Sequence, residues 1–192
     1  MTRLILASSS PYRKELLERL HIKFECISPN IDESSLENEQ PGAYVQRLAI
    51  EKAAEIGKTH ADSLIIGSDQ CCVNDNIILG KPKDRNNAIE QLRAASGKEI
   101  RFLTAVSIQH PSSNWHREWV DVFTVEFRKL SMSEIDRYLD VEQPFDSAGS
   151  FKSEKLGISL CESMHGDDPT ALIGLPLISV AQYLREFGLQ VP

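Results

Sequence analysis

The segment that most constrains the fold is the apolar run at residues 64–66, which leads through Gly67 to the acidic residue Asp69. A continuous apolar run bounded by glycine is typical of a buried strand. We expect this strand to end at Asp69, so that the carboxylate lies at the rim of a sheet. An acid flanked by apolar sequence needs a compensating partner, which makes Asp69 the first candidate for chemistry. The alternative is a strand-end residue that only hydrogen-bonds its own turn.

A second apolar segment, residues 77–79, follows the turn-rich residues 74–76 and leads to Lys81 in a Gly-Lys-Pro sequence. Two short apolar segments around such a turn predict a β-hairpin. If the two strands pair, Lys81 and Asp69 face the same site. Taken alone, Lys81 is better interpreted as a solvated loop lysine, so its candidacy rests on this pairing.

Bulk composition excludes several classes of protein. The chain has 192 residues, 41% of them hydrophobic and 26% charged, which is typical of one globular domain, with or without two lobes. The formal net charge of -7 disfavours direct binding to nucleic acid or to anionic membranes. No apolar stretch reaches transmembrane length, and we expect a cytoplasmic protein. The four cysteines show no Cys-x-x-Cys spacing, so neither a zinc site nor a disulfide framework is predicted.

The start of the chain has the pattern of an anion site. A short strand at residues 4–6 is followed by small polar residues, and Ser10 before a proline is a good N-cap for a helix. The free amides at such a helix start attract anions, and Ser8, Ser9 and Arg13 can add donors. The alternative is a capped helix with Arg13 facing solvent. The pattern is not a Walker loop, because the Gly-x-x-x-x-Gly-Lys sequence is absent.

A lysine lies on the apolar face of the next predicted helix, residues 42–58. Lys52 falls in the middle of the apolar stripe at about 100° per residue. This side chain either extends to the surface or points into a polar cavity and meets an anion. Asp32 and Glu33 follow a predicted strand at residues 24–28, and alone this acidic pair is weak support for a site.

The rest of the chain mixes helices and strands without strict alternation, which predicts a mixed sheet in an α/β or α+β domain. Ser131 and Glu134 form a capping box. The other predicted elements are a helix after Asp84, strands at 100–108 and 119–127, a helix ending near residue 139, a small-residue loop at 144–154, a strand at 157–160 and a final helix after Pro176.

Several motifs together resemble the Maf family of nucleoside triphosphate pyrophosphatases, in order along essentially the whole chain. They are Leu-Ala-Ser-x-Ser-Pro-x-Arg at the start, Asp-Glu at 32–33, Glu-Lys-Ala at 51–53, Gly-x-Asp at 67–69, Gly-Lys-Pro at 80–82, Ala-Gly-Ser at 148–150 and Ile-Gly-Leu-Pro at 173–176. No single motif decides the matter, but their joint occurrence is specific.

The resemblance implies one domain over residues 1–192 with a fold related to the inosine triphosphate pyrophosphatases. This fold is mixed α/β, with an elongated mixed sheet flanked by helices and two lobes around a central cleft, commonly in a homodimer. The implied reaction is hydrolysis of a nucleotide between the α and β phosphates, which releases a nucleoside monophosphate and pyrophosphate. The implied cofactor is a divalent metal cation, Mg²⁺ or Mn²⁺.

The resemblance also implies roles for the candidate residues. Asp69 matches the proton acceptor that activates water, and Glu33 and Asp69 would be metal ligands through carboxylate oxygens. The residues that would bind the triphosphate and neutralise the charge that develops in the transition state are Ser8, Ser9, Arg13, Lys52 and Lys81.

Three further positions resemble the subgroup that acts on 7-methyl-GTP: Tyr12, Gln70 and Glu154. Guanine methylated at N7 is positively charged, which favours an aromatic face such as Tyr12 and a carboxylate such as Glu154. The commoner residue of the subgroup at Tyr12 is tryptophan, so this position is a mild departure. In the alternative interpretation, Glu154 only pairs with Lys152 or Lys155 on the surface.

Two other functions stay open at this point. The chain could prefer dTTP or UTP, as the sister subgroup does, or other modified purines. Maf relatives are also associated with arrest of cell division and septum formation, so a non-catalytic regulator is the alternative of a different class. A pure scaffold would leave the assembled phosphate-binding residues unexplained.

Overall fold

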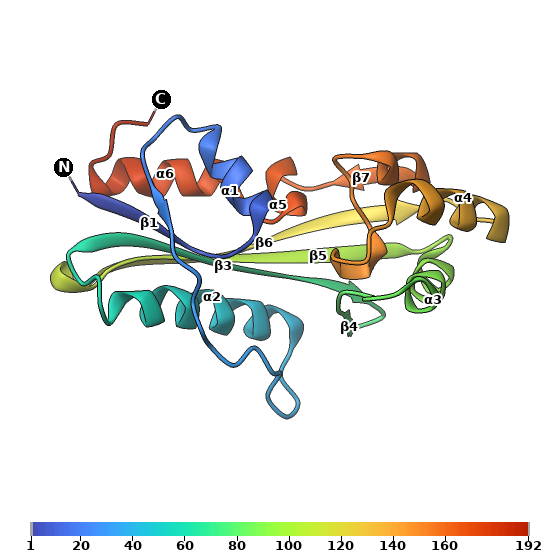
Figure 1. The fold of residues 1–192 in the computed structure, drawn as a ribbon, viewed down its shortest axis with the longest axis horizontal. Helices are drawn as coiled ribbons and strands as arrows, with labels where there is room; N and C mark the ends of the chain where they lie inside the picture. Colours follow the sequence, from blue (N-terminus) through green and yellow to red (C-terminus); the bar gives the residue numbers. More distant parts are fainter. Residues whose placement is uncertain (1, 192) are drawn as a thin grey trace. The chain divides into compact units, whose positions relative to one another are not determined.

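The computed structural model describes residues 2–191, and contacts between Cα atoms divide the chain into two compact units. The first unit comprises Met1–Asp69, Thr104–Asp121 and Asp168–Pro192, and the second comprises Gln70–Leu103 and Val122–Asp167. Figure 1 shows the elements of both units. Each unit combines strands with helices, as the sequence predicts for a mixed α/β protein.

Within the described residues, seven strands form one mixed sheet in the order β2-β1-β3-β5-β6-β7, with β4 paired to β3. The strands are β1 (Arg3–Ala7), β2 (Glu25–Cys26), β3 (Ser63–Asn74), β4 (Ile77–Leu79), β5 (Glu99–His110), β6 (Trp115–Phe127) and β7 (Cys161–His165). Strand β1 pairs in parallel with both β2 and β3, whereas β4 and β7 pair antiparallel with β3 and β6. The predicted hairpin of β3 and β4 is therefore confirmed.

Helices cover both faces of the strands in the first unit. Helix α2 (Pro41–Gly57) lies on one face, and α1 (Pro11–Glu18), α5 (Pro169–Ile173) and α6 (Leu177–Phe187) lie on the other (Figure 1). Ser10 caps α1 as expected, because its side chain accepts a hydrogen bond from the Arg13 backbone. No helix between residues 2 and 191 is both long and apolar enough to cross a lipid bilayer.

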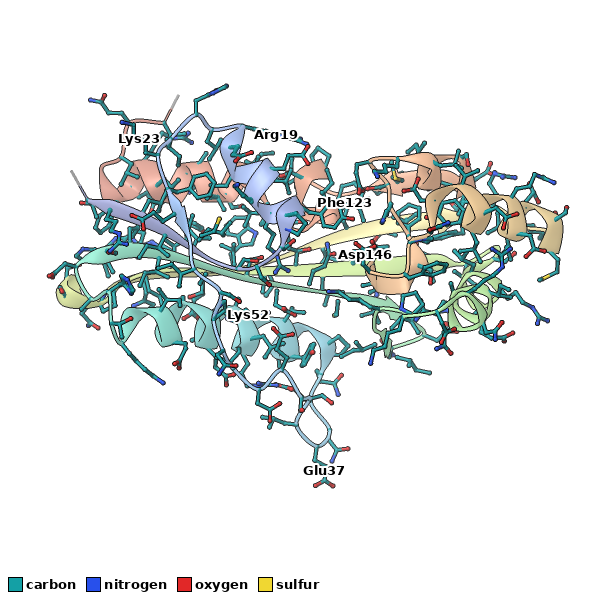
Figure 2. The ribbon with its side chains drawn as sticks, in the orientation of Figure 1. Arg19, Lys23, Glu37, Lys52, Phe123 and Asp146 are labelled. Atoms are coloured by element: carbon teal, nitrogen blue, oxygen red, sulfur yellow. The ribbon has the colours of Figure 1, made fainter. Side chains whose placement is uncertain are left out.

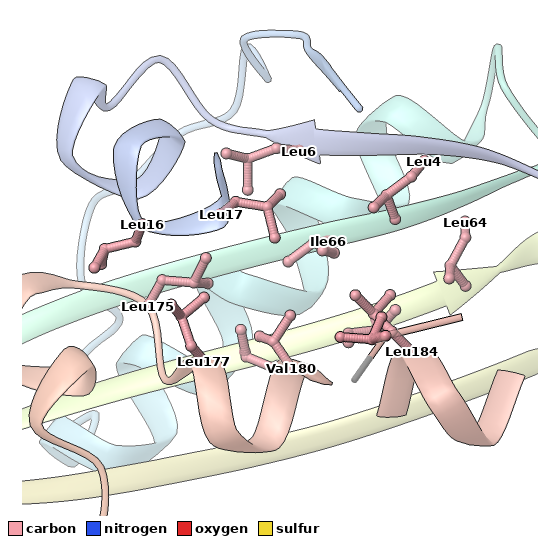
Figure 3. Packing of buried hydrophobic residues seen from close by; sticks show 13 residues of the cluster. Leu4, Leu6, Leu16, Leu17, Leu64, Ile66, Leu175, Leu177, Val180 and Leu184 are labelled. Atoms are coloured by element: carbon pink, nitrogen blue, oxygen red, sulfur yellow. The ribbon is translucent and has the colours of Figure 1, made fainter. Parts of the chain in front are cut away.

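The main apolar core of the first unit lies between β1, β3, α1 and α6, as Figure 3 shows in close-up. The buried residues labelled there are Leu4, Leu6, Leu16, Leu17, Leu64, Ile66, Leu175, Leu177, Val180 and Leu184. The alternate residues of the same strands, including Ile5 and Ile65, pack with Ala53 and Ile56 of α2 on the opposite face. Burial on both faces explains why these strands are continuously apolar, and each large side chain contributes about 1.5–3 kcal/mol.

The second unit contains α3 (Arg85–Ala95), α4 (Met132–Glu142) and the short 3-10 helices η2 (Ala148–Ser150) and η3 (Leu156–Leu160). Asp84 caps α3 by accepting from the Asn87 backbone, and the predicted capping box of Ser131 and Glu134 is present at α4. A further 3-10 turn, η1 (Pro111–Ser113), joins β5 to β6 and belongs to the first unit. The local start signals of the helices are thus confirmed.

Two predicted strands differ from the structure. The strand expected at residues 157–160 is wrong: this segment is the 3-10 helix η3, and the strand β7 begins afterwards at Cys161. Gly157 and Leu160 are the buried residues of η3, and a spacing of three places them on the same side of a 3-10 helix. The strand expected at 24–28 is reduced to Glu25 and Cys26, both exposed.

The capping box of α4 makes a testable contribution to acid stability. Hydrogen bonds from the Ser131 backbone (2.8 Å), the Ser131 hydroxyl (2.7 Å) and Arg128 lower the pKa of Glu134 to about 2. A depressed carboxyl pKa stabilises the fold above the unfolded pKa of about 4.5, and this contribution is lost as the pH falls toward 2. Glu134→Gln should therefore lower the melting temperature at pH 7 and approach the wild type as the pH falls from about 4.5 to 2.

The matched control is Glu90→Gln, which removes an exposed glutamate 3.3 Å from Arg93 on α3. An exposed ion pair of this kind contributes little to stability, so the control should have a melting temperature close to that of the wild type over the same pH range. Thermal melts followed by circular dichroism measure both variants. A Glu134→Gln deficit that does not change with pH would contradict the assignment.

Candidate active site

Asp69 lies inside a strand rather than at its end. The expectation that the strand ends there is wrong, because β3 runs from Ser63 to Asn74. The residues after it, Cys71, Cys72 and Val73, are buried and keep the strand in the core. Asp69 itself is only 7% exposed, so its carboxylate is largely removed from water and requires a charged or hydrogen-bonding partner.

That partner is Lys52 of α2. Its ammonium Nζ lies 2.6 Å from Asp69 Oδ1 and 2.7 Å from Glu33 Oε1, and the residue is 5% exposed. Figure 2 labels Lys52 on the helix. The interpretation in which Lys52 extends to the surface is therefore wrong, since the lysine meets anions in a buried position. One ammonium thus brings together the acid of a strand and the acid of a loop.

A close approach between α2 and β3 makes this contact geometrically feasible. A Cβ atom built on Gly67 would lie 2.1 Å from Ala49 O and 2.8 Å from Ala53 N, both on the helix backbone. Gly67 and Asp69 are two residues apart, so they face the same side of the strand. The glycine therefore permits the helix to approach closely enough for Lys52 to reach Asp69.

Arg13 of α1 is a second cation that interacts with Asp69 and Glu33. Its Nε donates to the backbone oxygen of Gly174 at 2.9 Å, and the hydroxyl of the buried Ser68 donates to the same oxygen at 3.2 Å. Burial lowers the pKa of Arg13, and the negative charges of Asp69 and Glu33 oppose this shift. The interpretation of Arg13 as a solvent-facing side chain is therefore wrong.

The residues that hold the Gly174 loop are not among those predicted from the sequence. Asp168, which is 2% exposed, accepts from the backbone nitrogens of Thr170 (2.8 Å) and Ile178 (2.7 Å) and from the Thr170 hydroxyl (2.6 Å). The Thr170 hydroxyl in turn accepts from the Leu177 backbone at 2.8 Å. The Asp-Pro-Thr sequence at 168–170 is a local N-cap signal, with Asp168 as the cap of α5, and this signal could have identified Asp168 and Thr170.

The serines at the start of α1 differ in environment. Ser8 is buried, and its hydroxyl oxygen accepts from the Ser10 backbone at 3.1 Å, whereas Ser9 is exposed. The loop from β1 into α1 therefore presents small polar side chains and the amides of the first helical turn. A helix start of this type suits an anion such as a phosphate.

The remaining candidates belong to both units. Tyr12 is a half-buried residue of the first unit, whereas Gln70, Lys81 and Glu154 belong to the second. Lys81 is exposed and lines a surface hollow of about 360 Å³ together with Asn87 and Gln91. That these residues join Asp69 in one site stays a prediction.

The two lysines proposed as surface partners of Glu154 have other ion pairs. Lys152 lies 3.0 Å from Asp146, which Figure 2 labels, and Lys155 lies 3.7 Å from Glu142. Neither ion pair includes Glu154, and the Glu154 side chain is exposed. The role of Glu154 stays a prediction.

Comparison with known proteins identifies the family. A family model described as Maf-like protein matches residues 3–187. The chain belongs to the Maf family. It is 50% identical over 189 residues to the 7-methyl-GTP pyrophosphatase of Alcanivorax borkumensis, covering 98% of this chain and 96% of that protein. The same name is carried by a relative from Vibrio vulnificus that is 50% identical over 188 residues, with 98% and 96% covered.

Solved structures place this Maf protein in a wider fold group. A HAM1 protein from Coxiella burnetii superposes with a TM-score of 0.55 at 13% identity, covering 97% of this chain and 100% of that one. The Ham1 protein of Staphylococcus aureus gives 0.51 at 14% identity over 81% and 90% of the two chains. Identities this low support the fold only, and they confirm the predicted relation of the Maf fold to this group.

The carboxylates of Glu33 and Asp69 are of the type that can bind a divalent cation together with the phosphates of a substrate. Among residues 2–191, no group of three or more His, Cys, Asp or Glu side chains is arranged to hold a metal ion. Glu33 and Asp69 both contact the Lys52 ammonium. Mg²⁺ is commonly held by one or two carboxylates together with substrate phosphates and water, so a pair of carboxylates fits this mode of binding.

The close approach at Gly67 can be tested by adding one methyl group. Because the neighbouring atoms belong to the α2 backbone, Gly67→Ala should force the helix away and destabilise the protein by about 2 kcal/mol or more. The matched control is Gly80→Ala, where the added carbon would have nothing within 4 Å and should change stability by less than about 0.5 kcal/mol. Urea unfolding measures both variants, and a Gly67→Ala midpoint equal to that of the wild type would contradict the argument.

Proposed function

We propose that this Maf family member is a nucleoside triphosphate pyrophosphatase that hydrolyses 7-methyl-GTP to 7-methyl-GMP and pyrophosphate. The observation that carries the proposal is the buried contact of Lys52 with Asp69 and Glu33. Both carboxylates also interact electrostatically with Arg13. Relatives named 7-methyl-GTP pyrophosphatase that are 50% identical over nearly the full length support the choice of substrate. The reaction would keep a modified nucleotide out of nucleic acids.

Asp69 is the proposed proton acceptor. A water molecule attacks the α phosphorus and its proton passes to the Asp69 carboxylate. The bond from the α phosphorus to the bridging oxygen breaks, so the nucleoside monophosphate keeps the water oxygen and pyrophosphate leaves. The Lys52 ammonium at 2.6 Å holds the carboxylate in one orientation and stabilises its negative charge. Burial limits the number of conformations that the base can adopt, which keeps it in a productive geometry.

The triphosphate would be bound by the start of α1 together with nearby cations. Ser8 and Ser9 line the loop that leads into the helix, and Arg13 projects from its first turn. Lys81, from the second unit, is the proposed additional cation. In phosphoryl transfer such groups act mainly by positioning the phosphates and by neutralising the charge that develops in the transition state.

Glu33 and Asp69 are the residues that would hold a divalent cation, Mg²⁺ or Mn²⁺. When bound, the cation supplies Lewis-acid stabilisation of negative charge on the phosphate oxygens. Lys52 lies between the two carboxylates in the protein alone, so its ammonium separates their like charges.

The base would be recognised by Tyr12, Gln70 and Glu154. An aromatic face and a carboxylate both favour the positive charge of 7-methylguanine, and the carboxylate can accept from the base N1 and N2 donors. Gln70 can donate and accept. A homodimer and a cytoplasmic location are further predictions that go with this function.

The test is phosphate release, with added inorganic pyrophosphatase and Mg²⁺, on 7-methyl-GTP, GTP, dTTP, UTP, CTP and ITP. We expect the highest kcat/KM on 7-methyl-GTP, and Glu154→Gln should reduce its preference over dTTP and UTP by about tenfold, the effect of one lost charged hydrogen bond. Glu162→Gln, on β7, is the matched control and should keep the wild-type ranking. A maximum on dTTP or UTP would refute the base assignment, and inactivity on the whole panel would favour the regulator of cell division.

The proton acceptor is tested with Asp69→Asn, which keeps the size of the side chain but removes the base. Loss of a general base should lower kcat by about 10²–10⁴-fold while nucleotide binding changes little. Steady-state kinetics and equilibrium dialysis with 7-methyl-GTP measure the two quantities. Asp62→Asn, which changes an exposed aspartate bonded to Ser112, is the control. Near-normal turnover by Asp69→Asn would overturn the proposed mechanism.

A further inference from the structure

The loop that carries Glu33 contains no helix or strand between β2 and α2. Its residues 27–40 lie beside α2, and Figure 2 labels Glu37 at its tip. Glu33 nevertheless has a defined position, because its carboxylate lies 2.7 Å from the Lys52 ammonium while the side chain is 58% exposed. A partly exposed acid on an irregular loop needs backbone anchors to stay there.

Two side chains of α2 supply these anchors. The Tyr44 hydroxyl donates to the backbone oxygen of Glu33 at 3.0 Å, and Arg47 Nη2 donates to the backbone oxygen of Ser34 at 3.0 Å. Tyr44 and Arg47 are three residues apart, so they lie on one face of the helix. The carbonyl groups of two consecutive loop residues are therefore held by the helix that also carries Lys52.

Arg47 is itself held by a forked ion pair. Its Nε and Nη2 donate to the two carboxylate oxygens of Glu39 at 2.7 and 2.8 Å, and Nη1 donates to Glu51 at 3.2 Å. Glu39 closes the loop by accepting from the Leu36 backbone at 3.0 Å. The Glu39 side chain is 7% exposed and that of Arg47 is 20% exposed, so this ion pair is better shielded than most surface pairs.

We propose that Arg47 is a positioning residue for the reaction: it fixes the loop so that the Glu33 carboxylate is presented next to Lys52 and Asp69. This inference rests on the proposed function, because Glu33 matters there as a ligand of the divalent cation. Arg47 touches neither carboxylate of the site directly. It acts through the backbone of Ser34 and the side chain of Glu39.

Only arginine can satisfy this arrangement. The guanidinium donates in three directions, to Glu39, to Glu51 and to a backbone oxygen, whereas a lysine ammonium is a compact charge without the planar fork. Arg47→Lys therefore keeps the charge and removes the geometry. Tyr44→Phe is a milder variant that removes the hydroxyl which anchors Glu33.

The experiment measures Mn²⁺ binding by electron paramagnetic resonance in the presence of pyrophosphate, together with kcat and KM for 7-methyl-GTP at varied Mg²⁺. Arg47→Lys should raise the Kd for Mn²⁺ and the half-saturating Mg²⁺ concentration about tenfold, with kcat at saturating Mg²⁺ within twofold of the wild type. Tyr44→Phe should shift both quantities in the same direction by about two- to fivefold.

A double-mutant cycle with Glu33→Gln separates positioning from a general structural role. If Arg47 acts through Glu33, the double variant binds Mn²⁺ no more weakly than Glu33→Gln alone. If the two effects multiply, or if Arg47→Lys leaves the Kd unchanged, the inference is overturned. Each comparison is made below the melting temperature of every variant, and Tyr44→Phe keeps the test available if Arg47→Lys fails to fold.

The matched control is Arg117→Lys, which removes a forked side chain that stacks on Trp115 and bonds Glu186 elsewhere in the first unit. It should leave the Kd for Mn²⁺ unchanged. Failure of the proposed function has a different signature, because it is inactivity of the wild type on the nucleotide panel. A wild type that is active but whose Mn²⁺ binding is insensitive to Glu33→Gln and Arg47→Lys would overturn this inference while the activity stands.

Discussion

The buried ammonium of Lys52 is the interaction on which the candidate site depends. A lysine in the apolar face of α2 would be costly to bury alone, and the two carboxylates within 2.7 Å offset that cost. The helix cannot move outward to release the lysine without losing the packing of its neighbours Ala53 and Ile56 on β1 and β3. The core of the first unit therefore holds the charges of Lys52 and Asp69 in contact.

The local charges of this cluster cancel. Arg13 and Lys52 carry two positive charges, and Glu33 and Asp69 carry two negative ones. An incoming triphosphate would thus meet no net positive charge from these four groups. A divalent cation that accompanies the nucleotide would supply the missing charge, which is the physical reason to expect a metal requirement in the proposed reaction.

Local sequence signals predicted the helix starts well, and they failed where tertiary contacts decide. Ser10, Asp84 and Ser131 cap their helices as expected, because an N-cap bond joins residues two or three apart. The expected end of β3 at Asp69 was wrong, since buried apolar residues continue the strand. The segment at 157–160 is a 3-10 helix, and its short apolar pattern does not distinguish a period of two from one of three.

The sequence by itself determined that the chain is a mixed α/β protein of the Maf family, that Lys52 lies on an apolar helix face, and that Asp69 follows a buried apolar run. Both features are visible because helices and strands have fixed periods. Only the tertiary structure decided that Lys52 binds Glu33 and Asp69, and that Arg13 donates to Gly174, 161 residues away. Such contacts depend on how closely two elements pack, as α2 and β3 do at Gly67. The distance between packed elements cannot be predicted from the spacing of residues along the chain.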